Sequence, residues 1–427
     1  MALEMRDRKE MDKEQKNESY PINNQSEMKR LMLLGGIRYL LPVIKAAHEQ
    51  GYYVITADYL PDNIAHKWSD EYCNVSIIDK EAVLKEAQRL QIDGIMSFAC
   101  DPGVVSASYV QNKLGLPSFG PFESVEILQN KDKFRAFLTE HGFNVPKAKG
   151  YNNAEDAIAD ANQWEYPVIV KPTDAAGSKG VTRVDEASQL KAAVDYAFNH
   201  SFSGHIIVED FIEKKGCSSD TDSFSEDGKL KFVSFCAQRF DAEATNPYTP
   251  AAYSWPSTFT KEEEAYLTSE IQRLITLLNL KTVVYNIEVR VAPNGKPYIM
   301  ELTPRGGGNR LCEMLRYATG VDMITAITRV MVGDPILEPI EQKPYNGHWA
   351  EIILHADESG AFDHLEISKD LPAEIVEEDL WVEKGDKVES FEGANNAIGT
   401  LVLRFNTSED LEHAITHQRE WLKVIVK

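Results

Sequence analysis

The chain has 427 residues, which is enough for two to four domains with substantial cores. Its net charge of −22 argues against binding to nucleic acid or to an anionic membrane, because both partners require basic patches. The five cysteines are scattered without CxxC spacing, which argues against a zinc site or a disulfide framework. No apolar run approaches the ~20 residues of a membrane span, and no apolar signal core is visible, so we expect a cytoplasmic protein.

The first 123 residues divide into a tail and a predicted α/β domain. Residues 1–28 are polar and charge-rich, which predicts a disordered tail. A buried strand at 31–34, the pair Gly35-Gly36 and a helical pattern then begin an alternation of strands and helices that is typical of a parallel sheet. The sequence GGIRYL lacks G-x-G-x-x-G spacing, so a dinucleotide-binding function is only a weak hypothesis.

The next segment combines lysines with a glycine- and serine-rich loop. A single helix is expected from Ser124 to Gly142, and its Lys131 could lie on a solvated face or bind an anion. A strand then ends at Lys171-Pro172, and the loop at 173–180 follows. This loop could be a plain hairpin connection, but with Lys171 before it the pattern favours phosphate binding through backbone N–H groups. The order of residues is not that of a Walker A loop.

The stretch from 283 to 310 predicts a β-hairpin that carries two acids. Asn294-Gly295 indicates a two-residue type I′ turn, which would set Glu288 directly opposite Glu301. Two opposed carboxylates repel, whereas Mg²⁺ accepts one or two carboxylates together with phosphate oxygens. The alternative is a solvated strand face with two unrelated acids. Arg305 and the glycines after it favour the metal site. The same register predicts one apolar face, made of Tyr285, Ile287, Val289, Val291, Tyr298, Met300 and Leu302.

Three other segments carry weaker signals. The acids after the strand at 205–209 could accept from an adenine amino group or could simply be solvated. Residues 239–258 are predicted to form a long irregular loop, and its Arg239, Tyr248 and Trp255 could contact substrate or only pack at the surface. Two helices are expected at 310–318 and 322–332. The last part, 339–427, is rich in short strands and predicts a small α+β domain without a catalytic constellation.

The motifs together resemble those of the ATP-grasp ligases. They occur in order as N-K-D-K-F-R at 130–135, V-K-P at 170–172, G-S-K-G-V at 177–181, V-E-D-F-I at 208–212 and I-E-V-R…I-M-E-L-T-P-R-G-G-G at 287–308. The last motif is most similar to the bacterial L-amino-acid (dipeptide) ligases of the bacilysin type. The resemblance implies an α/β and α+β multidomain chain with the ATP-grasp fold. It would have a Rossmann-like pre-ATP-grasp domain at 29–123, an ATP-grasp domain at 124–338 with a lid at about 140–205, and a β-rich domain at 339–427.

The resemblance also implies roles for individual residues. ATP and Mg²⁺, or Mn²⁺ in its place, would be the cofactors. Lys131 and Lys171 would contact phosphates, and Arg305 would act in catalysis with Glu301 and Lys171. Metal ligands would be Glu288, Glu301 and Thr303, the last standing where many relatives carry Asn. The nucleotide-binding residues would be Gly177, Ser178, Lys179, Gly180, Val181, Glu209, Asp210, Phe211 and Ile212. Gly307 and Arg310 would join Arg239, Tyr248 and Trp255 at the substrate.

The expected function is ATP-dependent ligation of a carboxylate to an amine through an acyl phosphate, with an amino acid as one substrate. The partners would be these small molecules, and a homodimer formed through the first domain is a family-level expectation. A purine-pathway or bicarbonate-activating ATP-grasp ligase is the second enzyme hypothesis. A non-catalytic ATP-binding module is a third, and it is disfavoured because both glutamates, both lysines and Arg305 are present.

Overall fold

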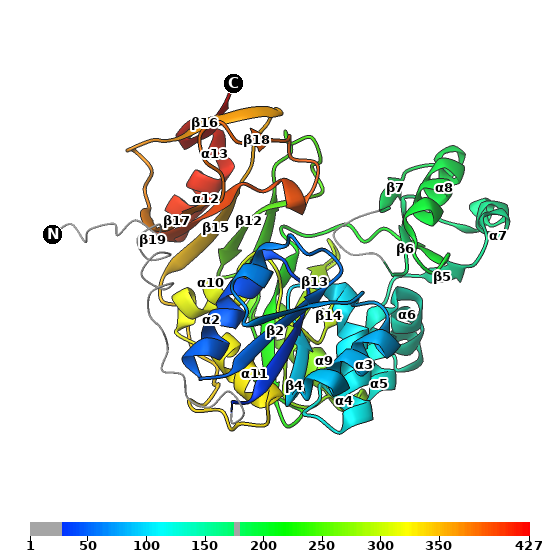
Figure 1. The fold of residues 1–427 in the computed structure, drawn as a ribbon. Coiled ribbons are helices and arrows are strands. Elements are labelled where there is room, and N and C mark those ends of the chain that lie inside the picture. Colours follow the sequence, from blue (N-terminus) through cyan, green and yellow to red (C-terminus); the bar gives the residue numbers. More distant parts are fainter. Residues whose placement is uncertain (1–27, 175–179) are drawn as a thin grey trace.

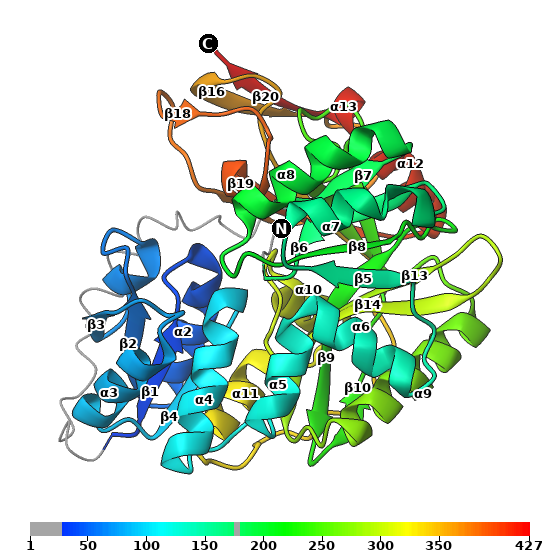
Figure 2. The same ribbon diagram turned by 90° about the vertical axis from the view of Figure 1, so that its right-hand side faces the viewer.

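The computed structural model describes residues 28–174 and 180–427 (Figure 1). Nearly all of the predicted tail lies outside the described residues, as do Gly177, Ser178 and Lys179 of the predicted phosphate loop. Among the described helices, none is long and apolar enough to cross a membrane. The described chain forms five sheets, and the helices cover their faces (Figures 1 and 2).

The first domain is a parallel sheet with the strand order β3-β2-β1-β4. Its strands are β1 (Arg30–Leu34), β2 (Tyr53–Asp58), β3 (Glu71–Asn74) and β4 (Gly94–Ser97), and its helices are α2 (Leu41–Glu49), α3 (Lys80–Leu90) and α4 (Val104–Leu114). Parallel pairing brings the carboxyl ends of β1 and β4 to one edge. At this edge, the loop after β4 contacts the segment 306–308 that follows the predicted hairpin, which we call the glycine loop. Ala99 N–H donates to the Gly306 carbonyl at 3.0 Å.

The second sheet forms a separate lobe with the order β5-β8-β6-β7, all antiparallel, and its own core. Its elements are β5 (Ala148–Tyr151), α7 (Ala154–Ala159), β6 (Val168–Pro172), β7 (Thr182–Val184), α8 (Leu190–His200) and β8 (Ile206–Asp210). The lobe projects from the body of the molecule in Figure 1. It carries Lys171 and Glu209 on adjacent strands that face the central sheet.

The third sheet, with the order β10-β9-β13-β14, is antiparallel and central to the predicted site. Its strands are β9 (Ser219–Glu226), β10 (Lys229–Phe232), β13 (Val283–Val291) and β14 (Pro297–Thr303), and α5 (Phe122–Gln129), α6 (Lys131–Glu140) and α9 (Lys261–Leu277) lie beside it. The prediction of one helix from Ser124 to Gly142 is wrong. Asn130 is extended (φ −120°, ψ 112°), and its side chain accepts from Lys133 N–H at 3.0 Å. It therefore caps a new helix that begins at Lys131.

The fourth sheet, with the order β11-β12-β15-β19-β17, joins the middle of the chain to its end. Its strands are β11 (Ala237–Phe240), β12 (Pro250–Trp255), β15 (His348–Leu354), β17 (Glu374–Leu380) and β19 (Gly399–Phe405). The irregular loop predicted at 239–258 is therefore wrong in part, because 239–240 belong to β11 and 250–255 to β12, whereas 241–249 lie in no strand or helix. The pairing of β12 with β15 also crosses the proposed domain boundary near residue 338.

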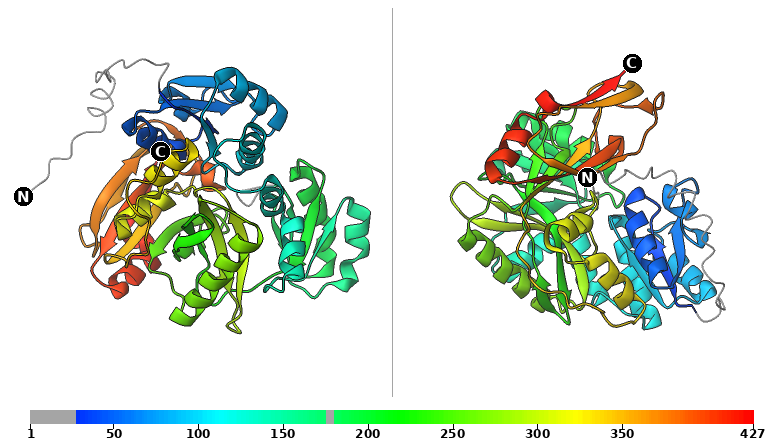
Figure 3. Two further views of the ribbon diagram at one scale, coloured as in Figure 1. Left: turned by 90° about the horizontal axis from the view of Figure 1, so that it is seen from below. Right: turned by 90° about the vertical axis from the view of Figure 1, so that its left-hand side faces the viewer.

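The remaining elements lie around the first domain and the third and fourth sheets (Figure 3). They are α10 (Leu311–Thr319), α11 (Met323–Met331), β16 (Gly360–Ile367), β18 (Lys387–Val388), α12 (Ser408–Thr416), α13 (Gln418–Trp421) and β20 (Leu422–Val426). Both helices predicted after the hairpin are confirmed to within a residue or two. We propose that the chain divides functionally near residues 123 and 338, with the fourth sheet as the connection between the last two parts.

Candidate active site

The hairpin of β13 and β14 places Glu288 directly opposite Glu301, as predicted. The predicted turn, however, is wrong. Ala292 N–H donates to the Lys296 carbonyl at 2.9 Å, so three residues form the loop, and Gly295 takes the positive φ of 79°. This longer loop shifts the register by one residue. A β-bulge between the pairs Glu288–Glu301 and Val289–Ile299 restores it, with Met300 as the extra residue.

The bulge also changes which side chains share a face. Tyr298 lies opposite Arg290 rather than on the face of Val289, and Met300 lies beside it. The predicted single apolar face is therefore wrong for these two residues. They form a small separate cluster with Ala292, against which Ile212 packs. An apolar patch thus lies next to the acidic face and reaches the end of the projecting lobe.

A row of three carboxylates crosses the central sheet. Glu288 pairs with Asp220 of β9 on one side and with Glu301 of β14 on the other. We call Asp220, Glu288 and Glu301 the acidic row. The adjacent row consists of Asp222, Asn286 and Thr303. Like charges at directly opposed positions destabilise a sheet, so this arrangement needs positive charge from elsewhere.

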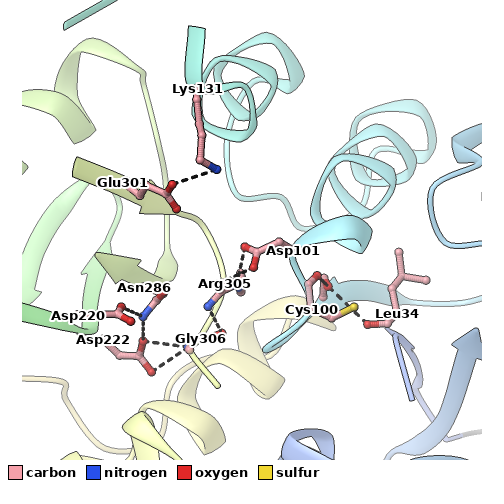
Figure 4. Close-up of polar contacts among 12 residues, drawn as sticks. Leu34, Cys100, Asp101, Lys131, Asp220, Asp222, Asn286, Glu301, Arg305 and Gly306 are labelled. Carbon is pink, nitrogen blue, oxygen red and sulfur yellow. Dashed lines mark hydrogen bonds and ion pairs between the residues drawn. The ribbon is translucent and has the colours of Figure 1, made fainter. Parts of the chain in front are cut away.

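Lysines from two elements bring some of that charge. Lys131, at the start of α6, lies 3.0 Å from Glu301 (Figure 4). Lys171, on β6, forms an ion pair with Glu209, whose other oxygen accepts from Arg135 Nε at 2.9 Å. Burial would raise the pKa of Glu209, but the charges of Arg135 and Lys171 outweigh burial and lower it to about 2. Both oxygens of Glu209 are thus engaged in holding cations.

Arg305 links the glycine loop to the first domain. Its guanidinium forms a bidentate pair with Asp101 at 2.9 and 2.8 Å, and it also donates to the Gly306 carbonyl (Figure 4). The side chain of Arg305 is 10% exposed and that of Asp101 is 28% exposed. A bidentate pair fixes the plane of the guanidinium as well as its position. Asp101 was not predicted, because it lies 204 residues away in the sequence.

Two aspartates beneath this loop are held by uncharged donors. Gly307 N–H donates to both oxygens of Asp222 at 2.9 and 3.0 Å, and the amide nitrogen of Asn286 donates to Asp220 at 2.9 Å. Burial raises the pKa of Asp222 to about 6, and burial together with the charge of Glu288 raises the pKa of Asp220 to about 7. A Cβ on Gly307 would meet the Asn286 nitrogen at 2.8 Å and the Asp222 oxygen at 2.9 Å, so only glycine fits there.

The end of the glycine loop is strained and strongly paired. Asn309 and Arg310 both have positive φ, 49° and 55°, which is unusual for arginine. Arg310 donates to Glu313, Glu377 and the Thr400 hydroxyl. Asn309 donates to the Tyr253 hydroxyl at 3.0 Å. The loop therefore joins the central sheet to the fourth sheet.

The structure does not bring the three residues predicted to contact substrate from the loop at 239–258 to this site. Trp255 is fully buried and its indole donates to Ser234 at 3.2 Å, so it is a core residue and its predicted substrate contact is wrong. Arg239 points away from the glycine loop and forms an ion pair with Glu412 of α12. Tyr248 is 63% exposed on a surface loop.

The donor set of the acidic row fits a hard divalent cation. The side chains of Glu288 and Glu301 are 30% and 40% exposed, so their oxygens remain accessible although each touches one cation. Mg²⁺ in proteins accepts one or two carboxylates together with phosphate oxygens. Thr303 is mostly buried, and its backbone lies opposite Asn286.

Comparisons with known proteins agree with this geometry. Residues 164–313 match the ATP-grasp domain family. The large chain of an arginine-specific carbamoyl phosphate synthase from Geobacillus stearothermophilus is 24% identical over 234 residues, which cover 54% of this chain and 21% of that protein. The chain thus spans about a fifth of the length of that curated relative.

Two solved structures match nearly the whole chain. An L-amino acid ligase from Bacillus licheniformis aligns with a TM-score of 0.77 at 20% identity, covering 93% of this chain and 99% of that one. A phosphoribosylglycinamide synthetase from Anaerococcus prevotii aligns with a TM-score of 0.73 at 22% identity, covering 94% and 100%. The prediction of the ATP-grasp fold is confirmed. The ADP-forming ligase class and the use of ATP with Mg²⁺ stay predictions.

Proposed function

We propose that the chain joins a carboxylate to an amine at the expense of ATP, through an acyl phosphate, and that one of its substrates is an amino acid. The observation that carries this proposal is the meeting of the acidic row with Lys131, Lys171 and Arg305 at one face, from four different parts of the chain. An attacking carboxylate and the γ-phosphate of ATP are both anions. Fixed cations beside a metal site offset that repulsion without reorganisation.

The nucleotide would lie between the lobe and the central sheet. Lys131 and Lys171 would bind its phosphates, with the backbone at Gly180 and Val181 at their far side. The apolar patch of Met300, Tyr298 and Ile212 would pack against the base. Because both oxygens of Glu209 hold Lys171 and Arg135, we assign Glu209 to positioning these cations, and we assign recognition of adenine to the backbone from Asp210 to Ile212.

Glu288 and Glu301 would hold Mg²⁺, which would neutralise charge on the phosphates. Asn286 lies opposite Thr303, and its amide nitrogen is engaged by Asp220 and Asp222. The carbonyl oxygen of Asn286 is therefore a candidate metal ligand, in place of the Asn that many relatives carry at the position of Thr303. Arg305, whose guanidinium is oriented by Asp101, would steady the transferred phosphoryl group and the acyl phosphate. Gly307 would allow close approach of the backbone.

The chemistry after phosphoryl transfer needs no nucleophilic side chain. An acyl phosphate is attacked directly by the amine, and phosphate leaves. Since water would also attack it, closure of the lobe over the central sheet would protect the intermediate. The amine substrate would enter beside Gly307 and Arg310, between the glycine loop and the first domain.

The experiment is Mg²⁺-dependent phosphate release from ATP with a matrix of carboxylates against amines. Release that requires one carboxylate–amine pair, and that is lost in Glu301→Gln but kept in the exposed control Glu262→Gln, would support the proposal. Failure of the purified chain to bind Mg·ATP would refute it.

The second enzyme candidate is a purine-pathway or bicarbonate-activating ligase. It is favoured by the two synthetases among the similar proteins, the carbamoyl phosphate synthase and the phosphoribosylglycinamide synthetase. Phosphate release that depends on bicarbonate, with ammonia or a sugar amine as acceptor, would decide for it.

A further inference from the structure

A row of side chains crosses the fourth sheet on the face turned toward the glycine loop. The register runs from Gln238 to Tyr253, then to Glu351, Val402 and Glu377. Side chains at directly paired positions point to the same face of a sheet. The neighbours of Glu351 two residues away, Trp349 and Ile353, pack into the main core with the glycine loop's helix α10, whereas Ala350 and Ile352 pack on the opposite face.

Glu351 stands out within this row. Its exposed fraction is 0%, and among the described residues neither of its carboxylate oxygens has a hydrogen-bond partner. A buried acid without a partner is costly in free energy, so its presence requires an explanation. Burial raises the pKa of Glu351 well above its ordinary value, and the charge of Arg310 only partly opposes this.

The surroundings of Glu351 carry an excess of negative charge. Glu313 and Glu377 act electrostatically on it together with Arg310, and Arg310 is hydrogen-bonded to those two acids and Thr400 rather than to Glu351. Three carboxylates thus lie around one guanidinium. The Tyr39 hydroxyl is also close enough for the charge of Glu351 to raise its pKa.

The same place is connected to the acidic row by polar groups. Tyr39 donates to Asn309 at 3.1 Å, Asn309 donates to the Tyr253 hydroxyl at 3.0 Å, and that hydroxyl lies 3.5 Å from Asp220. Tyr253 is the direct cross-strand neighbour of Glu351. Tyr253 therefore lies between Glu351, its neighbour on the next strand, and Asp220, the first residue of the acidic row.

We propose that Glu351 binds a cationic nitrogen group of one substrate, an inference that rests on the proposed ligase function. The group is distinct from the attacking amine, which must be uncharged to react. It can be a basic side chain or the α-ammonium group of the amino acid whose carboxylate is activated. Glu351, with the excess charge of Glu313 and Glu377, supplies the counter-charge, and the Tyr39 hydroxyl lies close to it.

The test compares matched probes in the full chain. L-arginine against L-citrulline isolates a side-chain cation, and L-leucine against its 2-hydroxy acid isolates the α-ammonium group. Binding of each probe is measured by calorimetry with and without Mg·AMP-PNP, and phosphate release is measured separately. The wild-type chain should favour the cationic member of one pair by about 30-fold or more, as expected when a buried charge loses its partner. Which pair responds identifies the source of the cation.

Glu351→Gln should reduce this preference to near unity while leaving the affinity for Mg·AMP-PNP within about twofold. The matched control is Glu378→Gln, which removes an exposed acid on β17 that pairs with Leu401. In Glu351→Gln, the glutamine keeps the shape of the side chain and removes a buried charge. The melting temperature of this variant should therefore not fall, and a thermal melt checks this. Equal binding of both members of each pair by the wild type, or a preference that survives in Glu351→Gln, would overturn the inference. Lack of Mg·AMP-PNP binding by the wild type would instead refute the proposed function.

Discussion

Two groups of acids in this chain balance their charge in different ways. Asp241, His355, Asp357 and Arg419 form a cluster that we call the Arg419 cluster. In it, Arg419 donates to Asp241 at 2.6 Å and to both oxygens of Asp357 at 2.7 and 2.9 Å. In the acidic row, by contrast, three carboxylates are direct neighbours across the strands. Glu288 pairs with Arg290 on its own strand, and Glu301 pairs with Lys131 of α6.

The Arg419 cluster has the ligand types of a metal site, since its donor atoms lie within 4.8 Å of one another. Arg419 donates to both aspartates, so one guanidinium already engages two of the three residues that could hold an ion. In the acidic row, different cations contact Glu288 and Glu301. The two groups therefore differ in how the counter-charge is arranged, and not in the presence of acids.

The largest expected effect is on the acidic row. Glu301→Gln keeps the shape of the side chain but removes one of the two proposed metal-binding charges, so turnover should fall by roughly a thousandfold or more. Phosphate release at saturating Mg²⁺ measures the loss. Arg419→Met, which breaks the other cluster, should keep turnover within about threefold of the wild type. Equal losses in both variants would contradict the distinction drawn above.

A smaller effect is expected where the first domain contacts the site. Asp101→Asn removes the charge that fixes Arg305, so kcat should fall about 10- to 100-fold while the KM for ATP changes little. Steady-state kinetics separates the two parameters. Asp101→Glu, which retains the charge at a changed distance, should recover part of the loss. If the KM for ATP rises instead, Asp101 contributes to nucleotide binding and not to the orientation of Arg305.

The hairpin shows what local sequence can and cannot predict. The opposition of Glu288 and Glu301 was predicted correctly because two local features compensate each other: a three-residue loop shifts the register, and the bulge at Met300 shifts it back. Sequence patterns carry no clear signal for a bulge, and so the face of Tyr298 was predicted wrongly. The order of the motifs was enough for the fold, since all but the first, which lies at the start of α6, are in or next to a recognisable strand.

The rest of the site depends on pairing between distant segments. Asp220 joins the acidic row only because β9 pairs with β13, and Asp101 reaches Arg305 only through the docking of the first domain. Trp255 belongs to a strand whose flanking prolines and serines resemble those of a loop, which explains why it was assigned to the substrate and not to the core. Alternation along 218–224 places Asp220 and Asp222 on one face of a strand, but it cannot identify the neighbouring strand.

A prediction of intermediate size concerns the pH dependence of the Arg419 cluster. The hydrogen bond with His355, with the charge of Arg419, holds the pKa of Asp241 well below its ordinary value. A lowered folded-state pKa gives stability that is present above the unfolded pKa of about 3.9 and is lost as the pH falls below it. At pH 7 the free energy of unfolding of Asp241→Asn should therefore be about 1–2 kcal/mol lower than that of the wild type. Urea titrations from pH 3 to pH 8 should show this difference shrinking below about pH 4.

Asp220 should show the opposite sign, because burial and the charge of Glu288 raise its pKa to about 7. A raised folded-state pKa gives a contribution that is present below the unfolded pKa and is lost as the pH rises through the folded value. Asp220→Asn should thus be more stable than the wild type by about 1 kcal/mol at pH 8, with no difference near pH 4. Urea titrations in EDTA measure this, since a bound cation would favour the charged carboxylate. Adding Mg²⁺ at pH 8 should stabilise the wild type more than Asp220→Asn. A stability difference that has the same sign and pH dependence for Asp220 and Asp241 would mean that both groups of acids are structural.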